Sequence, residues 1–184
     1  MSETMKDTIK KLVEAWGPSG FEHKVRAIIE QEVADLADEI TVDGLGNMIC
    51  RVGKGGPKVL VASHMDEIGV MATYAEKSGY LRFTRIGGLI NAALRGNRVR
   101  FEDGTLGVIG VHAGSDGSNL DDFYIDVDDG SGPRADLVGR PASFWREFEE
   151  RGQRLVSKAM DDRIGCVVAI EAMRKLKKET PNEV

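Results

Sequence analysis

The chain has 184 residues, 41% hydrophobic and 30% charged, with a formal net charge of −5. This balance allows a buried core and argues against nucleic acid as the main partner. No run of about 18 apolar residues is present, so no membrane span is predicted, and the N-terminus has no apolar signal-peptide core. Cys50 and Cys166 lie far apart in apolar segments, which predicts buried thiols and a cytoplasmic protein rather than a disulfide framework.

Two amphipathic helices are predicted at the start of the chain. Apolar residues at helical spacing indicate a helix over residues 5–16, which the segment 17–20 ends. Ser19 is followed three residues later by Glu22, a capping-box pattern, so a second helix is expected to begin at Ser19. The apolar stripe expected to face the core from this second helix consists of Val25, Ile28, Ile29, Val33 and Leu36.

The spacing of apolar residues changes from residue 39 onward and becomes typical of strands. Short strands are expected at 40–42 and 48–52, and the apolar run 59–62 predicts a buried core strand. Evenly spaced short strands with glycine-containing turns follow, which favours an antiparallel barrel or sandwich. These strands are expected at 69–74, 80–86, 98–101, 105–111, 123–128 and 137–144.

Helical spacing returns after Asp161, with a stripe expected at Ile164, Val167, Val168, Met173 and Leu176. The order of elements therefore predicts an α/β domain, formed by residues 1–68 and 155–184, into which an all-β domain of residues 69–154 is inserted.

The core strand predicted at 59–62 leads directly to His64 and Asp66. In open α/β sheets, ligands bind at the carboxyl ends of strands. A neutral imidazole there can bind a divalent metal through one nitrogen while a carboxylate fixes its tautomer through the other. On its own, the pattern is more often a loop histidine beside a turn aspartate than a metal site.

A second candidate site lies where a short strand at 155–156 meets the last helix. Asp161 and Asp162 are adjacent there, and either could cap the helix. One aspartate is enough for a cap, so the other is free to bridge two metal ions about 3.5–4 Å apart.

Three segments together resemble the glutamyl and tetrahedral aminopeptidases, a family of dinuclear metallopeptidases. They are GPSG at 17–20, SHMDEIG at 63–69 and SKAMDDRIGC at 157–166. The resemblance covers essentially the whole chain. It implies an α/β/α sandwich with an inserted β-barrel, peptide substrates that lose N-terminal amino acids, and a homo-oligomer.

The resemblance also implies a role for each candidate residue. His64 would bind one of two divalent ions (zinc or cobalt), Asp161 would bridge both, and Asp66 would act in the catalytic site by holding His64. A cis peptide bond between Asp161 and Asp162 is typical of the family. In complete members, the general base is the first Glu of a Glu-Glu pair beyond the last helix, followed by further Asp and His ligands.

This chain ends where that Glu-Glu strand would begin, so we expect it to be the N-terminal portion of such an enzyme or a truncated gene product, inactive by itself. A non-catalytic assembly or binding module with a vestigial metal site is the alternative. A glycosidase would need paired catalytic carboxylates. The adjacent pairs Asp121–Asp122 and Asp128–Asp129 lie in turn-rich sequence and are interpreted as solvated loop charge.

Overall fold

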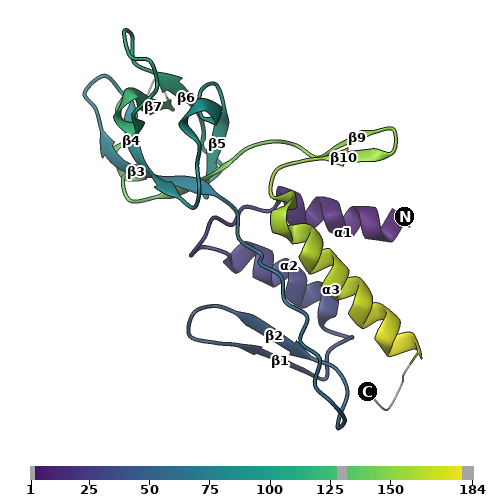
Figure 1. Cartoon of the computed structure of the whole chain (residues 1–184). Helices are drawn as coiled ribbons and strands as arrows, with labels where there is room; N and C mark the ends of the chain where they lie inside the picture. The colour runs from purple at the N-terminus through teal and green to yellow at the C-terminus, as the bar shows by residue number, and fades with distance from the viewer. Residues whose placement is uncertain (1–2, 128–131, 180–184) are drawn as a thin grey trace. The chain divides into compact units, whose positions relative to one another are not determined.

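The computed structural model describes residues 3–127 and 132–179. The chain divides into two compact units, one formed by Met1–Asp66 with Phe148–Val184 and the other by Glu67–Glu147. We call them the helical unit and the barrel unit (Figure 1). The helical unit resumes at residue 148, earlier than the boundary predicted at residue 155. The predicted strand at 155–156 is part of a hairpin whose first strand, residues 149–151, was not predicted.

The helical unit contains three helices and two separate antiparallel hairpins, β1–β2 and β9–β10, among its described residues. The helices pack against one another through a shared apolar core (Figure 1). The elements are α1 (Glu3–Glu14), α2 (His23–Val33), β1 (Glu39–Val42), β2 (Met48–Arg51), β9 (Glu149–Arg151), β10 (Arg154–Val156) and α3 (Met160–Glu179).

The hairpin β9–β10 is held to α1 at both ends of that helix. Lys6 pairs with Glu150 at 2.6 Å, and the carboxylate of Glu14 accepts the backbone N–H of Phe148 at 3.0 Å. The Phe148 side chain packs on the core of the helical unit. These contacts explain why the unit boundary lies before the hairpin.

Four residues of the stripe predicted for α2 face the core: Val25 and Val33 are fully buried and Ile28 and Ile29 pack against them. Leu36 lies beyond the end of the helix, and the helix begins at His23 rather than at Ser19. The capping-box prediction was therefore wrong. The backbone N–H of Gly20 is bonded to the Glu22 carboxylate at 2.5 Å. Ser19 caps no helix and makes a different contact.

The buried face of α3 matches the predicted stripe only in part. Val167 is buried and Ile164 and Met173 pack against the same core, as predicted. Val168 and Leu176 are exposed, whereas Cys166 and Ile170, which were not predicted, are buried. Arg163 occupies the same stripe, four residues before Val167, and is fully buried. Arg163 thus lies on the buried face of α3, where a stripe predicted from apolar residues alone leaves it out.

One carboxylate joins the three helices. Glu32 on α2 accepts from Lys11 on α1 at 2.9 Å and pairs with Arg174 on α3. Burial alone would raise the pKa of Glu32, but the hydrogen bonds and charges of Lys11 and Arg174 outweigh it, so the pKa lies below its ordinary value of 4.5.

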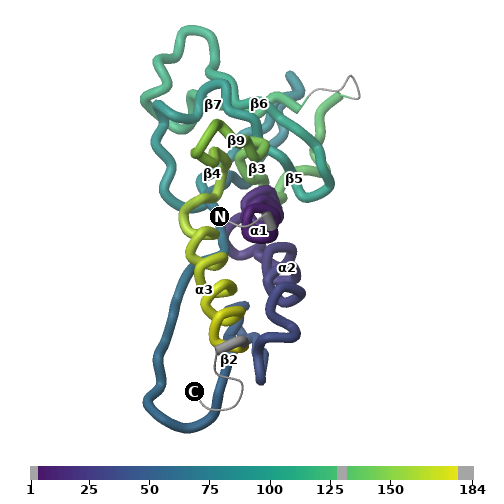
Figure 2. The backbone as a smooth tube through the Cα atoms, turned by 90° about the vertical axis from the view of Figure 1, so that its right-hand side faces the viewer, coloured from purple at the N-terminus to yellow at the C-terminus, as the bar shows by residue number. Residues whose placement is uncertain are grey.

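The prediction of a core strand at 59–62 is not confirmed. Val59 and Leu60 are 87% and 88% exposed, and no strand of the described chain pairs with this segment. Figure 2 shows the chain after β2 as a wide loop that stands clear of α3. Strand structure requires a hydrogen-bonded neighbour, and the described residues provide none here.

The barrel unit is a closed antiparallel barrel with strand order β3-β4-β7-β6-β5-β8. Alternate residues fill its interior, as in β5, where Val99 and Phe101 are buried and Arg98 is exposed. In β6, a side chain at Gly110 would meet the ring of Tyr124 at 2.3 Å. The strands are β3 (Gly69–Ala75), β4 (Leu81–Ile86), β5 (Arg98–Phe101), β6 (Leu106–Val111), β7 (Phe123–Asp126) and β8 (Pro141–Phe144), with short 3-10 helices η1 (Asn91–Ala93), η2 (Leu120–Asp122) and η3 (Ala135–Leu137).

The strands match the predicted segments to within one residue at each end, with two exceptions. Residues 137–140 precede β8, and β7 ends at Asp126 instead of at residue 128, which lies outside the described residues. The fold is thus mixed α/β with a closed six-stranded barrel. None of the described helices is long and apolar enough to cross a membrane.

Candidate metal site

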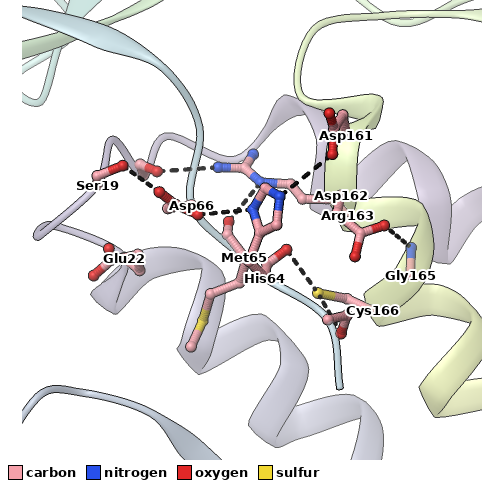
Figure 3. Close-up of polar contacts among 12 residues, drawn as sticks. Ser19, Glu22, His64, Met65, Asp66, Asp161, Asp162, Arg163, Gly165 and Cys166 are labelled. Carbon is pink, nitrogen blue, oxygen red and sulfur yellow. Dashed lines mark hydrogen bonds and ion pairs between the residues drawn. The ribbon is translucent and has the colours of Figure 1, made fainter. Parts of the chain in front are cut away.

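The structure brings His64 and Asp161 together, as predicted, although 97 positions separate them in the sequence. The Nε2 atom of His64 lies 3.3 Å from Oδ1 of Asp161, and its Nδ1 lies 2.8 Å from Oδ1 of Asp66 (Figure 3). In the tautomer with its proton on Nδ1, the ring donates to Asp66 and presents the Nε2 lone pair toward Asp161.

The separation of these two atoms fits a shared metal ion. Two ligands of one tetrahedral zinc, each about 2.0–2.2 Å from it, lie about 3.3–3.5 Å apart. His64 Nε2 and Asp161 Oδ1 are 3.3 Å apart. The Asp161 side chain is 96% exposed, so its second oxygen is open to another ion. Within residues 3–127 and 132–179, no three His, Cys, Asp or Glu side chains are arranged to hold one ion.

The two adjacent aspartates make different contacts. The Asp162 carboxylate accepts the backbone N–H of Gly165 at 3.0 Å and so caps the regular part of α3. A side chain at Gly165 would stand 2.4 Å from that carboxylate, so glycine leaves space for the cap. Asp161 remains available, as the sequence suggested. The peptide bond between Asp161 and Asp162 is cis.

The family is shown by the sequence itself. Residues 46–184 match the model of the M42 glutamyl aminopeptidase family. The chain belongs to this family.

Individual aminopeptidases are also similar to this chain in sequence and in structure. The lysyl aminopeptidase of Pyrococcus furiosus is 35% identical over 92% of this chain and 54% of its own length. Among solved structures, the TET aminopeptidase of Thaumarchaeota archaeon SCGC AB-539-E09 matches with a TM-score of 0.86 and 33% identity, over 97% of this chain and 55% of that one.

A further solved structure is that of the TET1 peptidase of Pyrococcus horikoshii, which can assemble into a tetrahedron or a large octahedral shell. It matches with a TM-score of 0.81 and 32% identity, over 94% of this chain and 56% of that one. The chain spans about half the length of the curated relatives that it matches.

Arg163 connects this candidate site to the rest of the helical unit. Its guanidinium is fully buried. It donates to the carbonyl of Met65 at 3.0 Å and to those of Leu12 at 2.7 Å and Ala15 at 2.6 Å. The last turn of a helix leaves carbonyls without intrahelical partners and favours a cation. Arg163 therefore stabilises the end of α1 and fixes the backbone between His64 and Asp66.

The backbone of His64 is held by a thiol from α3. Burial raises the pKa of Cys166, so the thiol is protonated at neutral pH. Its Sγ–H donates to the carbonyl of His64 at 3.4 Å, and the hydroxyl of Ser63 donates to Sγ at 3.5 Å. A neutral, buried thiol suits this supporting contact better than it suits metal ligation.

The other two histidines and the carboxylate pair Asp121–Asp122 take part in different contacts. His23 packs edge-on against Trp16, with ring centroids 5.9 Å apart. His112 lies in the barrel unit beside the ring of Tyr124. Asp122 takes part in a capping box of η2, consistent with the prediction of loop charge. The pair Asp128–Asp129 lies outside the described residues.

Sequence reasoning did not identify Arg163 and Cys166 as part of the site. Both could have been found by extending the helical stripe backward, because residues 163, 166, 167 and 170 recur at helical spacing. An arginine on an otherwise apolar stripe indicates a buried cation that needs partners. For Ser19, the capping-box pattern predicted a bond to the first turn of α2, but its hydroxyl donates to the carboxylate of Asp66 instead.

Proposed function

We propose that this chain carries part of the metal site of an aminopeptidase that releases N-terminal amino acids from peptides. The observation that carries the proposal is the convergence of His64 and Asp161 at 3.3 Å, with Asp66 behind the imidazole. Family membership supports the reaction class. His64 is assigned as a ligand of one ion, Asp161 as the bridge between two ions, and Asp66 as the residue that fixes the tautomer of His64.

Bound divalent ions would act as Lewis acids and lower the pKa of a coordinated water. Histidine nitrogen and carboxylate oxygen suit zinc and cobalt. The contribution of this chain is positional. Asp66 keeps the proton on Nδ1, and Asp162 caps α3 so that Asp161 stays open. The proposal places the general base and the remaining ligands outside the 184 residues, and assigns the helical unit to an α/β/α sandwich.

Metal binding by the purified chain is the first test. Cobalt titration, followed by absorption, is expected to show weak binding that a chelator reverses, because tight sites need more ligands per ion than His64 and Asp161 supply. His64→Ala should abolish the signal and His23→Ala should leave it unchanged. A signal that survives in His64→Ala would show that the ions bind elsewhere. This titration also separates a metal site from a simple ion pair between His64 and Asp161.

Peptidase activity is the second test, using aminoacyl-p-nitroanilides with zinc or cobalt. Residues 1–184 are compared with a version extended through the downstream reading frame. We expect activity only in the extended version, with loss in Asp161→Ala and retention in the matched Asp121→Ala variant. If the short chain is as active as the extended one and His64→Ala abolishes that activity, then residues 1–184 contain the whole catalytic site and our assignment of the general base is wrong.

We also propose that the complete protein is a cytoplasmic homo-oligomer. The assembly of the TET1 peptidase into closed shells supports the oligomer. The free thiols of Cys50 and Cys166 suit a reducing compartment. Light scattering coupled to gel filtration of the extended version should give a mass of several subunits, and a monomer at micromolar concentration would contradict the proposal.

A further inference from the structure

Ser19 makes a contact that its sequence context does not predict. Its hydroxyl donates to Oδ2 of Asp66, while Oδ1 of the same carboxylate faces Nδ1 of His64 at 2.8 Å. Figure 3 shows the chain of contacts from Ser19 through Asp66 to His64 and Asp161. Both oxygens of Asp66 are thus engaged, one by a hydroxyl and one by the imidazole.

The loop that carries Ser19 is itself fixed. The backbone N–H of Phe21 donates to the carbonyl of Pro18 at 2.8 Å. Gly20 has a φ of +87°, a conformation that favours glycine. A side chain at Gly17 would meet Val25 at 2.6 Å, so the start of the loop lies directly against α2. The hydroxyl of Ser19 is therefore presented from a defined backbone rather than from a free loop.

The Asp66 carboxylate needs such a partner because it is not enclosed by the fold. Its side chain is 31% exposed, and that of His64 is 57% exposed, so water can compete for either oxygen. A carboxylate bonded on one side only can rotate and release Nδ1. Bonded on both sides, it holds the imidazole plane and the Nδ1–H tautomer.

We propose that Ser19 is a positioning residue of the metal site, acting through Asp66 to keep the His64 Nε2 lone pair directed at the ion. This inference deepens the proposed function and rests on His64 being a ligand. It accounts for the unused capping pattern, because the hydroxyl that could have capped α2 is bonded to Asp66 instead. The N–H of Gly20 is satisfied by Glu22.

The tautomer of His64 can be measured without metal. The chain has three histidines, so ¹⁵N-histidine spectra are simple to assign with His64→Ala. We expect the Nδ1–H form of His64 in the wild type and a mixture of tautomers in Ser19→Ala. His112, in the barrel unit, serves as the internal reference.

Two matched comparisons isolate the hydroxyl. Ser19→Thr keeps it and Ser19→Val removes it at nearly equal size, so Thr should restore the Nδ1–H form and Val should not. Ser78→Ala removes a similar serine-to-carboxylate bond, that to Glu76 in the barrel unit, and should change nothing at His64. If Ser19→Ala does not fold, the Thr and Val pair still decides the question.

Cobalt titration provides the second measurement. Loss of partners behind a ligand typically weakens metal binding 10–100-fold, and we expect about tenfold for Ser19→Ala and Ser19→Val, with recovery in Ser19→Thr. The inference is overturned if His64 keeps its tautomer in Ser19→Val, or if Thr behaves as Val does. If the wild type binds no cobalt while the tautomer still responds to Ser19, the proposed function fails and the positioning of the ring by Ser19 stands.

Discussion

Replacing Arg163 by Met tests the buried guanidinium that connects α1, α3 and the backbone after His64. The substitution keeps an unbranched side chain of similar length and removes the charge and all the donors. It leaves the carbonyls of Leu12, Ala15 and Met65 without the donor that now lies within 3.0 Å of each. We expect a large loss of stability in the helical unit.

The magnitude follows from those three bonds. Hydrogen bonds to a charged donor contribute about 1.5–3 kcal/mol each, about 4.5–9 kcal/mol for three. Desolvation of the guanidinium offsets several kcal/mol of this sum. The net loss expected for Arg163→Met is therefore about 3–5 kcal/mol, at the upper end for a single substitution.

Urea unfolding followed by circular dichroism at 222 nm measures this loss, because α1, α2 and α3 all lie in the helical unit. Arg151→Met is the matched control. That arginine pairs with Glu149 at the surface and is 64% exposed, so its loss should cost less than about 1 kcal/mol. A loss under about 1 kcal/mol for Arg163→Met would refute the assigned role of the buried guanidinium.

Three other substitutions test further contacts. Gly165→Ala should displace the Asp162 cap, at a cost of about 1–2 kcal/mol in urea unfolding, and a stabilised variant would contradict the cap. Because the pKa of Glu32 is lowered, its contribution to stability is present above about pH 4.5 and is lost as the pH falls through the folded-state value. The melting temperature should therefore fall less steeply in Glu32→Gln than in the wild type between about pH 5 and pH 3, and parallel curves would count against the three-helix contact. Leu60→Glu should change the stability of the 184-residue chain by less than about 0.5 kcal/mol and reduce its light scattering, whereas a loss of about 2 kcal/mol would show that this segment is buried.

Local sequence patterns predicted the elements of the barrel unit well. Its strands alternate buried and exposed residues over short distances, and glycines mark the turns between them, so each strand and its orientation are encoded within a few residues. The closure of the six strands into one barrel depends on the long-range pairing of β3 with β8, which joins Gly69 to Ser143. No local pattern specifies that pairing.

The segment 59–62 shows the limit of the same reasoning. Its apolar run has the composition of a buried strand, but a strand forms only where another strand offers backbone partners. The described chain offers none, and Val59 and Leu60 are exposed. His64 was predicted to lie at the carboxyl end of this strand. The described structure has no such strand, and His64 still lies beside Asp161.

By itself, the sequence pointed to the candidate residues of the metal site. His64, Asp66 and Asp161 stand out by residue type and spacing, and the segments around them identify the M42 family. Only the tertiary structure decided how they meet. Arg163 and Cys166 on α3 hold the backbone of Met65 and His64, and Ser19 holds Asp66. These contacts join residues 47 to 102 positions apart. The packing of three helices positions them, because side-chain identity along the chain carries no information about which distant carbonyl or carboxylate a donor will reach.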